Sequence, residues 1–305
     1  MKDKILSVTS LRKTLGNIEC EYQWIEKITH PHKVLLLGSS TVKYGLSCSI
    51  LNKLSGDSLK FINLGANARD PIVTYFLIRN IDLKGVDAMY MGLDPWIYSK
   101  NYYIHRNKIM YSDFSTAEAA TYFKKQDRQI FQTRWKNLAS YFMGSSSLGN
   151  CISADQQIPG DFGSMKMEQQ PLNFNDPVQD KFKVNIFGWS TLQFIYLLKI
   201  EKYCRQNGIA FFVFIPPKRS DFCNAYKSYS LPVHAEFVKH LEDIHFQSPI
   251  FGTFDQLRNL GDTLLFSDAY HLNETGQKIY SKLFFEMISS KNRTIFGSAY
   301  KWFID

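Results

Sequence analysis

The chain has no apolar run long enough to cross a membrane. Its longest apolar stretches, Val34–Leu37 and Ile209–Ile215, fall far short of the roughly 20 residues that a spanning helix needs. The basic opening MKDKILSVTSLRKTLGNIEC also lacks the apolar core and the cleavage-like site of a signal peptide. We therefore expect a soluble, cytoplasmic protein without a membrane span.

Cysteine is scarce as well. The five cysteines are widely spaced and form neither a Cys-x-x-Cys pair nor a zinc-ligand pattern with histidine, so we expect reduced, mostly structural thiols and no metal site. Walker A, Rossmann glycine, His-Glu-x-x-His and Gly-x-Ser-x-Gly patterns are absent too. These absences argue against a P-loop nucleotide enzyme, a Rossmann dehydrogenase, a zinc protease of that class and an α/β-hydrolase elbow.

Positive charge is in excess and unevenly spread. The 305 residues carry 36 Lys and Arg against 28 Asp and Glu, a formal net charge of +8, and the stretch Tyr98–Lys136 alone holds eight basic and three acidic residues among many aromatic ones. Such a stretch can stack on sugar rings and attract acidic groups, which would suit an acidic glycan; the alternative is two amphipathic helices with basic outer faces. No RRM, KH or helix-turn-helix signature is present, so we expect no nucleic-acid partner.

Short apolar runs alternate with longer segments of helical period, which is typical of a parallel sheet with crossover helices. The predicted strands are Lys33–Leu37, Leu59–Leu64, Asp87–Met91, Ile209–Ile215 and Pro249–Phe254. The predicted helices are Val42–Leu54, Pro71–Ile81, Ser190–Asn207, Leu231–His245 and Glu274–Ser290, the last with Asn273 as its N-cap. The expected fold class is α/β, with three layers α/β/α around a five-stranded parallel sheet.

A long stretch without a strand pattern, residues 98–187, separates the first three predicted strands from the last two. Its first half is aromatic and basic, and its second half is rich in Gly, Ser, Pro and Asn. Loops of this length inside a compact domain are uncommon and are usually functional or disordered. We therefore expect one α/β domain formed by residues 1–97 and 188–305, with an inserted helical and irregular cap at 98–187.

Three sets of polar residues stand at the carboxyl ends of predicted strands, where open α/β sheets bind their ligands. The first is Gly38-Ser39-Ser40, directly after the first strand. A serine on a strand-to-helix turn lies near backbone N–H groups that favour a developing negative charge, which makes Ser40 a candidate nucleophile. The alternative is that Ser39 or Ser40 only caps the following helix.

The second set is Asp268-Ala269-Tyr270-His271, ahead of the last predicted helix. A nucleophilic serine needs a base to take its proton and an acid to orient that base, and His271 and Asp268 are candidates for these two roles. The alternative is that Asp268 caps a turn and His271 is a buried structural histidine.

The third set is formed by the loops after the second and third strands, Asn63–Ala68 and Gly92–Trp96. Each loop can present backbone N–H groups or a polar side chain to an oxyanion near Ser40. The alternative is that both loops are plain turns.

In combination, these blocks resemble the SGNH (GDSL-like) hydrolase superfamily, in which four blocks follow in this order along a flavodoxin-like sheet. Ser40 in Gly-Ser-Ser matches the family nucleophile, with Ser39 where the family has aspartate, a variation similar to the D-alanyl transfer and alginate O-acetyltransferase branches. Asp268 and His271 match the Asp-x-x-His block. The resemblance covers Lys33–Trp96 and Ile209–Ser290.

The resemblance implies a flavodoxin-like fold and an oxyanion hole. Asn63 aligns with the asparagine that opens the second block, so Ala68 stands where the family has its oxyanion glycine. The candidate oxyanion donors are the backbone N–H groups of Ser40, Gly65 and Ala68 and the side chain of Asn67.

The third-block asparagine of the family aligns with Asp94, and an ionised carboxylate accepts hydrogen bonds but donates none. Either Asp94 turns away from the site, or the activity is lower, different or absent. Arg69, Trp96 and Tyr270, which flank the blocks, are candidate substrate-binding residues.

Together, these residues predict a serine-dependent acyl-ester enzyme, an O-acetyltransferase or an O-acetylesterase, that acts on a carbohydrate such as a bacterial surface polysaccharide through an acyl-enzyme at Ser40. No bound cofactor is expected, and acetyl-CoA or another acyl donor is a candidate co-substrate. The alternative is a noncatalytic protein of the same fold that binds or assembles glycans, with its oxyanion hole disabled by Asp94.

Overall fold

The computed structural model describes residues 25, 27–67, 69–99, 161–166, 188–220, 231–253, 256–260, 264–268 and 270–295. Among these residues, five strands form one all-parallel sheet in the order β2-β1-β3-β4-β5. The strands are β1 (Lys33–Leu37), β2 (Lys60–Asn63), β3 (Val86–Gly92), β4 (Ala210–Phe214) and β5 (Ile250–Phe251). The predicted five-stranded parallel sheet is therefore confirmed.

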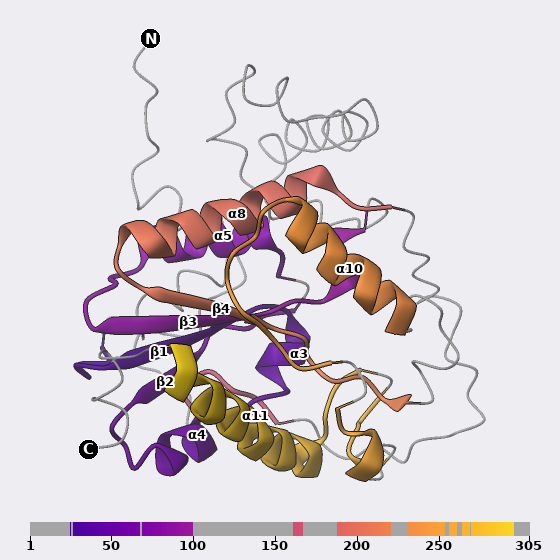
Figure 1. The fold of residues 1–305 in the computed structure, drawn as a ribbon. Helices are drawn as coiled ribbons and strands as arrows, with labels where there is room; N and C mark the ends of the chain where they lie inside the picture. The colour runs from indigo at the N-terminus through magenta and orange to yellow at the C-terminus, as the bar shows by residue number, and fades with distance from the viewer. Residues whose placement is uncertain are drawn as a thin grey trace, which may run out of the picture.

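Helices cover both faces of this sheet (Figure 1). One layer contains α5 (Pro71–Asn80), α8 (Thr191–Gln206) and α10 (Leu231–Asp243), and the other contains α3 (Ser40–Lys43), α4 (Cys48–Leu54) and α11 (Glu274–Ile295). Two short 3-10 turns, η1 (Pro95–Tyr98) and η4 (Arg258–Leu260), follow β3 and β5. The three-layer α/β/α class is confirmed as well.

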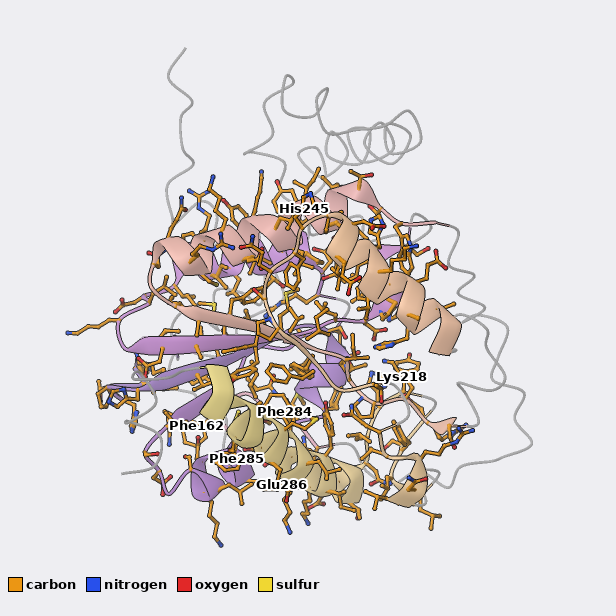
Figure 2. The ribbon with its side chains drawn as sticks, viewed as in Figure 1. Phe162, Lys218, His245, Phe284, Phe285 and Glu286 are labelled. Atoms are coloured by element: carbon orange, nitrogen blue, oxygen red, sulfur yellow. The ribbon has the colours of Figure 1, made fainter. Side chains whose placement is uncertain are left out.

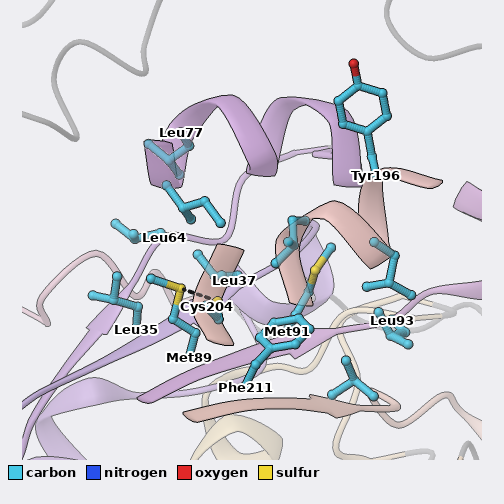
Figure 3. Close-up of a cluster of buried hydrophobic side chains, with 14 of the residues drawn as sticks. Leu35, Leu37, Leu64, Leu77, Met89, Met91, Leu93, Tyr196, Cys204 and Phe211 are labelled. Carbon is cyan, nitrogen blue, oxygen red and sulfur yellow. Dashed lines mark hydrogen bonds between the residues drawn. The ribbon is translucent and has the colours of Figure 1, made fainter. Parts of the chain in front are cut away.

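The central strands are mostly apolar because both of their faces are covered. All five residues of β1 are buried, and successive side chains point to opposite faces of a strand. Leu35 and Leu37 join the core under α5 and α8 (Figure 3), whereas Val34 and Leu36 join the core under α4 and α11. Burial on both faces therefore explains the unbroken KVLLL run.

The segment predicted as one helix after β1 forms two helices, α3 and α4. The expected helix Val42–Leu54 is broken after α3, where the amide of Tyr44 bonds back to the carbonyls of Ser40 and Val42. The chain restarts as α4 with Ser47 as N-cap, whose hydroxyl accepts a hydrogen bond from the Ile50 amide. The break leaves the turn that carries Ser40 as a separate short helix.

The ends of the insertion lie side by side. Ser99 and Trp189 form an antiparallel bridge, and the Ser190 amide donates to the Tyr98 carbonyl over 2.7 Å. The predicted inserted region otherwise lies outside the described residues, apart from 161–166, and the predicted domain division stays a prediction.

Residues 161–166 lie against β2, an edge strand of the sheet. The Asn63 amide donates to the Phe162 carbonyl over 2.9 Å, and the Met165 amide donates to the Lys43 carbonyl over 3.0 Å. The Phe162 ring, labelled in Figure 2, lies under the Lys60 ammonium at 3.7 Å from the ring centroid. The insertion thus contacts both β2 and the end of α3.

Within the described ranges, none of the helices combines the length and the apolar composition that crossing a membrane requires.

Candidate active site

Ser40 is the first residue of α3, immediately after the tight turn that ends β1. The turn requires glycine at position 38, because its φ is +139° and a Cβ there would lie 2.9 Å from the Gly92 carbonyl oxygen. Ser39 caps the helix, since its hydroxyl accepts a hydrogen bond from the Thr41 amide. The capping alternative therefore applies to Ser39 and leaves the Ser40 hydroxyl for another partner.

That partner is His271. Its Nε2 lies 2.7 Å from Ser40 Oγ, although the two residues are 231 positions apart in the chain. Its Nδ1 lies 2.7 Å from Asp268 Oδ2. With Nδ1 protonated and donating to the carboxylate, Nε2 is left to accept the hydroxyl proton, which is the arrangement of a nucleophile, base and orienting acid. The structure thus brings the three predicted catalytic side chains together.

Asp268 holds both the ring and the backbone of the loop that carries His271. Its Oδ1 accepts hydrogen bonds from the amides of Tyr270 and His271, over 2.9 and 2.7 Å. Burial alone would raise the pKa of Asp268, but the hydrogen bond and charge of His271 and the two amides outweigh it and hold the pKa below its ordinary value. The carboxylate is therefore ionised at neutral pH, and its turn-capping role accompanies its bond to His271.

Two aromatic rings pack against the His271 ring. Tyr270 lies 4.2 Å and Tyr44 lies 5.4 Å from it, measured between ring centroids. The His271 side chain is 12% exposed, so the ring is largely shielded from water. Burial and the charges of Asp268 and Asp94 raise the pKa of Tyr270 to about 12, which keeps its phenol neutral.

The predicted oxyanion donors differ in whether their N–H groups already have a hydrogen-bond acceptor. As the first residue of a helix, Ser40 has an N–H group without an intrahelical acceptor. The Gly65 amide instead donates to Asn63 Oδ1 over 2.9 Å in this conformation, and its predicted role as an oxyanion donor stays a prediction. Asn67 is exposed, and Ala68 lies outside the described residues.

Asp94 is buried and paired with a residue that the sequence analysis missed. Its Oδ2 lies 2.8 Å from the ammonium of Lys218, and the two side chains are 1% and 0% exposed. Lys218 follows β4 in the segment Ile215–Arg219 and is labelled in Figure 2 on the side of the sheet where α3 lies. A lysine and an arginine directly after a predicted strand were the signal that could have drawn attention to it.

The predicted substrate-binding residues fall into two groups. Tyr270 lies at the site, in contact with the His271 ring. Arg69 is buried and donates to the Leu64 carbonyl, and Trp96 packs on the core beneath α5 and α8. The structure gives Arg69 a bond to the loop after β2 and does not place Arg69 or Trp96 in a described contact with the triad.

A second residue that the sequence analysis did not assign a structural role is Asn63, the last residue of β2. Its side-chain amide donates to the carbonyls of Val42 and Leu46, over 2.9 and 3.2 Å, and approaches the Ser164 hydroxyl at 3.4 Å. Together with its bond from Gly65, this buried side chain connects the end of α3 to the loop after β2. It therefore helps to hold Ser40, at the start of α3, in place.

The described residues offer no group of three or more His, Cys, Asp or Glu side chains arranged to hold a metal ion. Two thiols in this part of the chain, Cys48 and Cys204, are free and buried. Burial raises the pKa of Cys204 to about 12 and that of Cys48 further, so both are unreactive thiols in the folded protein.

Compared with known proteins, the chain matches no family model, and no curated protein matches it significantly in sequence.

Proposed function

We propose that this protein is a serine-dependent acyl-ester enzyme, an O-acetylesterase or an O-acetyltransferase acting on a carbohydrate. The observation that carries the proposal is the continuous hydrogen-bonded chain from Ser40 Oγ through His271 to Asp268, with 2.7 Å at each step. An aligned chain of this kind activates a hydroxyl that is otherwise a weak nucleophile.

In the proposed reaction, Ser40 Oγ attacks the acyl carbonyl carbon while His271 Nε2 takes the hydroxyl proton. The tetrahedral intermediate then collapses, the bond to the leaving oxygen or sulfur breaks, and His271 returns the proton to the leaving group. Water or a sugar hydroxyl next attacks the acyl-enzyme and gives its proton to His271. This second tetrahedral intermediate collapses as the bond between Ser40 Oγ and the acyl carbon breaks, and His271 returns the proton to Ser40 Oγ. The acid or the acylated sugar is released with the Ser40 hydroxyl restored, so protons and bonds balance over the cycle.

The roles of the chain's own residues follow from their contacts. Asp268 keeps the proton on His271 Nδ1 and stabilises the imidazolium that forms during each transfer. The Ser40 amide at the start of α3 is the supported candidate donor to the oxyanion. Tyr270 and Tyr44 restrict water around the ring, and a site that excludes water would favour transfer over hydrolysis.

The finer predictions belong to the same proposal. They are a bacterial surface polysaccharide as the carbohydrate, with acidic groups, acetyl-CoA or another acyl donor as co-substrate, no nucleic-acid partner and a cytoplasmic location. The occupied Gly65 amide favours the second candidate function, a noncatalytic protein of this fold that binds or assembles glycans.

Labelling with a fluorophosphonate probe tests the proposal, because the probe reacts with activated serines. We expect the wild-type protein to label, Ser40→Ala to lose labelling, and the matched control Ser39→Ala to keep it, since Ser39 only caps α3. Equal labelling of Ser40→Ala would refute the assignment. An unlabelled wild-type protein that binds glycan would support the noncatalytic candidate instead.

Turnover then separates the two reactions. The acyl-enzyme formed from acetyl-CoA or an acetylated model ester should release acetate in water alone if the protein is an esterase. If it is a transferase, release should depend on an added sugar acceptor and yield the acetylated sugar.

A further inference from the structure

The ion pair between Lys218 and Asp94 lies close to the triad. Tyr270 connects them, because its ring centroid lies 4.2 Å from that of His271 and 5.8 Å from the Lys218 ammonium. The backbone connects them as well. Asp94 is two residues after Gly92, and the Gly92 carbonyl oxygen lies beside Gly38 in the turn that leads into Ser40.

Both charges of this pair are removed from water. Lys218 is 0% and Asp94 is 1% exposed, and they share one hydrogen bond of 2.8 Å. The second oxygen of Asp94, Oδ1, is buried and has no hydrogen-bond partner among the described residues. Removing one member of such a pair leaves a buried, uncompensated charge.

The charge of Asp94 also acts on two tyrosines, Tyr270 and Tyr98. Burial and the charges of Asp268 and then Asp94 raise the pKa of Tyr270, and burial and the charges of Asp70 and then Asp94 raise the pKa of Tyr98. Neither phenol carries a charge at neutral pH, so neither can compensate the carboxylate. Lys218 supplies the cation that is in direct contact with it.

We propose that Lys218 is a positioning residue for the reaction at Ser40: it neutralises Asp94, so that the oxyanion forms beside a neutral pair and not beside a bare carboxylate. The inference rests on the proposed function. It explains how the site can hold a buried aspartate at position 94, although a carboxylate donates no hydrogen bond. As a general estimate, a like charge about 8 Å from a forming oxyanion, at an effective dielectric constant of about 20, slows such a step on the order of thirtyfold.

The proposal predicts a distinctive dependence on pH. In Lys218→Met, Asp94 is buried without its cation, and burial disfavours a carboxylate relative to the neutral carboxylic acid. When the pH is lowered and Asp94 takes up a proton, its repulsion disappears. The rate of Lys218→Met relative to wild type must therefore rise as the pH is lowered, which a loss of packing alone would not produce.

The test compares fluorophosphonate labelling rates of wild type, Lys218→Met, Asp94→Asn with Lys218→Met, and Lys33→Met between about pH 5.5 and 8.5. Lys33→Met is the matched control, because Lys33 is also a buried lysine but begins β1 at the other end of the sheet. We expect Lys218→Met to label about thirtyfold slower at the alkaline end, with the deficit shrinking at lower pH. The double variant should label within about threefold of wild type, and the control should equal wild type.

The double variant keeps the inference falsifiable even if Lys218→Met does not fold, because it leaves no buried charge unpaired. A double variant that is folded but labels more than about thirtyfold slower than wild type would overturn the inference and show that the ammonium itself is needed. Lys218→Met that labels at the wild-type rate, or a labelling deficit that does not change with pH, would overturn this inference but not the proposed function. An unlabelled wild-type protein would overturn the proposed function and this inference together.

Discussion

Replacing Asn63 by alanine should loosen the fold and slow Ser40 at the same time. The side chain is 2% exposed, and its two shortest hydrogen bonds, to the Val42 carbonyl and from the Gly65 amide, are both 2.9 Å long. Each buried group left without a partner costs about 1–3 kcal/mol. The Gly65 amide loses its acceptor, whereas the Val42 carbonyl keeps the Gly45 and Leu46 amides. We therefore expect Asn63→Ala to lower the free energy of unfolding by about 1–3 kcal/mol.

The effect on Ser40 follows from where these groups lie. Val42 belongs to α3, so loss of the Asn63 side chain removes the hydrogen bonds that join this short helix, which holds Ser40 against His271, to the loop after β2. A nucleophile displaced by a fraction of an ångström reacts much more slowly. We therefore expect the fluorophosphonate labelling rate to fall by about tenfold or more, even where the protein is fully folded.

Asn52→Ala is the matched control. Asn52 is 3% exposed and its side-chain oxygen accepts a hydrogen bond of 2.7 Å from the Phe61 amide, but it lies on α4 and makes no described contact with α3. Urea unfolding should show a loss of about 1–3 kcal/mol, with an unchanged labelling rate. If Asn63→Ala loses stability but labels as fast as Asn52→Ala, the positioning argument for Asn63 is wrong.

Two further predictions concern the loop that carries His271. Asp268→Asn should be less stable than wild type at about pH 7, and this difference in stability should shrink as the pH falls below 3.8, the ordinary pKa of the group. The reason is that a carboxyl with a lowered pKa contributes stability above its ordinary pKa and loses that contribution when it is protonated. Urea unfolding at several pH values checks this, and a difference that stays constant would contradict it. Gly276→Ala should cost about 2–3 kcal/mol and slow labelling, because the new Cβ would lie 2.0 Å from the Leu265 carbonyl oxygen at the base of this loop. Thr275, the residue before Gly276, is exposed, so the control Thr275→Ala should change the free energy of unfolding by less than about 0.5 kcal/mol. If the two variants unfold in urea and label alike, the steric explanation is wrong.

The strands and the triad could be read from the sequence because each rests on a strong local signal. The apolar run of β1 reflects burial on both faces. Parallel strands bring their carboxyl ends to one edge, which is why Ser40 and His271 could be expected to meet. The break after α3 was missed, because the backbone bonds that end a short helix leave little trace in apolar periodicity.

The partners of the site were harder to predict. Lys218 and Asp94 are 124 positions apart, and nothing in either segment alone specifies that their side chains meet in the interior. The occupied Gly65 amide is a different case, because Asn63 is only two residues away and asparagine side chains commonly bind nearby backbone amides. That local pattern was readable in principle.

The adjacent ends of the insertion have a consequence for anyone who wishes to shorten this protein. Because Ser99 and Trp189 are paired neighbours, a tight turn could splice them without changing the path from β3 to α8. The deletion would nevertheless take away the Phe162 carbonyl and the Met165 amide, which bind β2 and the Lys43 carbonyl. A minimal variant therefore needs a graft that replaces these two contacts at β2 and at the end of α3, since a linker alone would remove a hydrogen bond from the helix that carries Ser40.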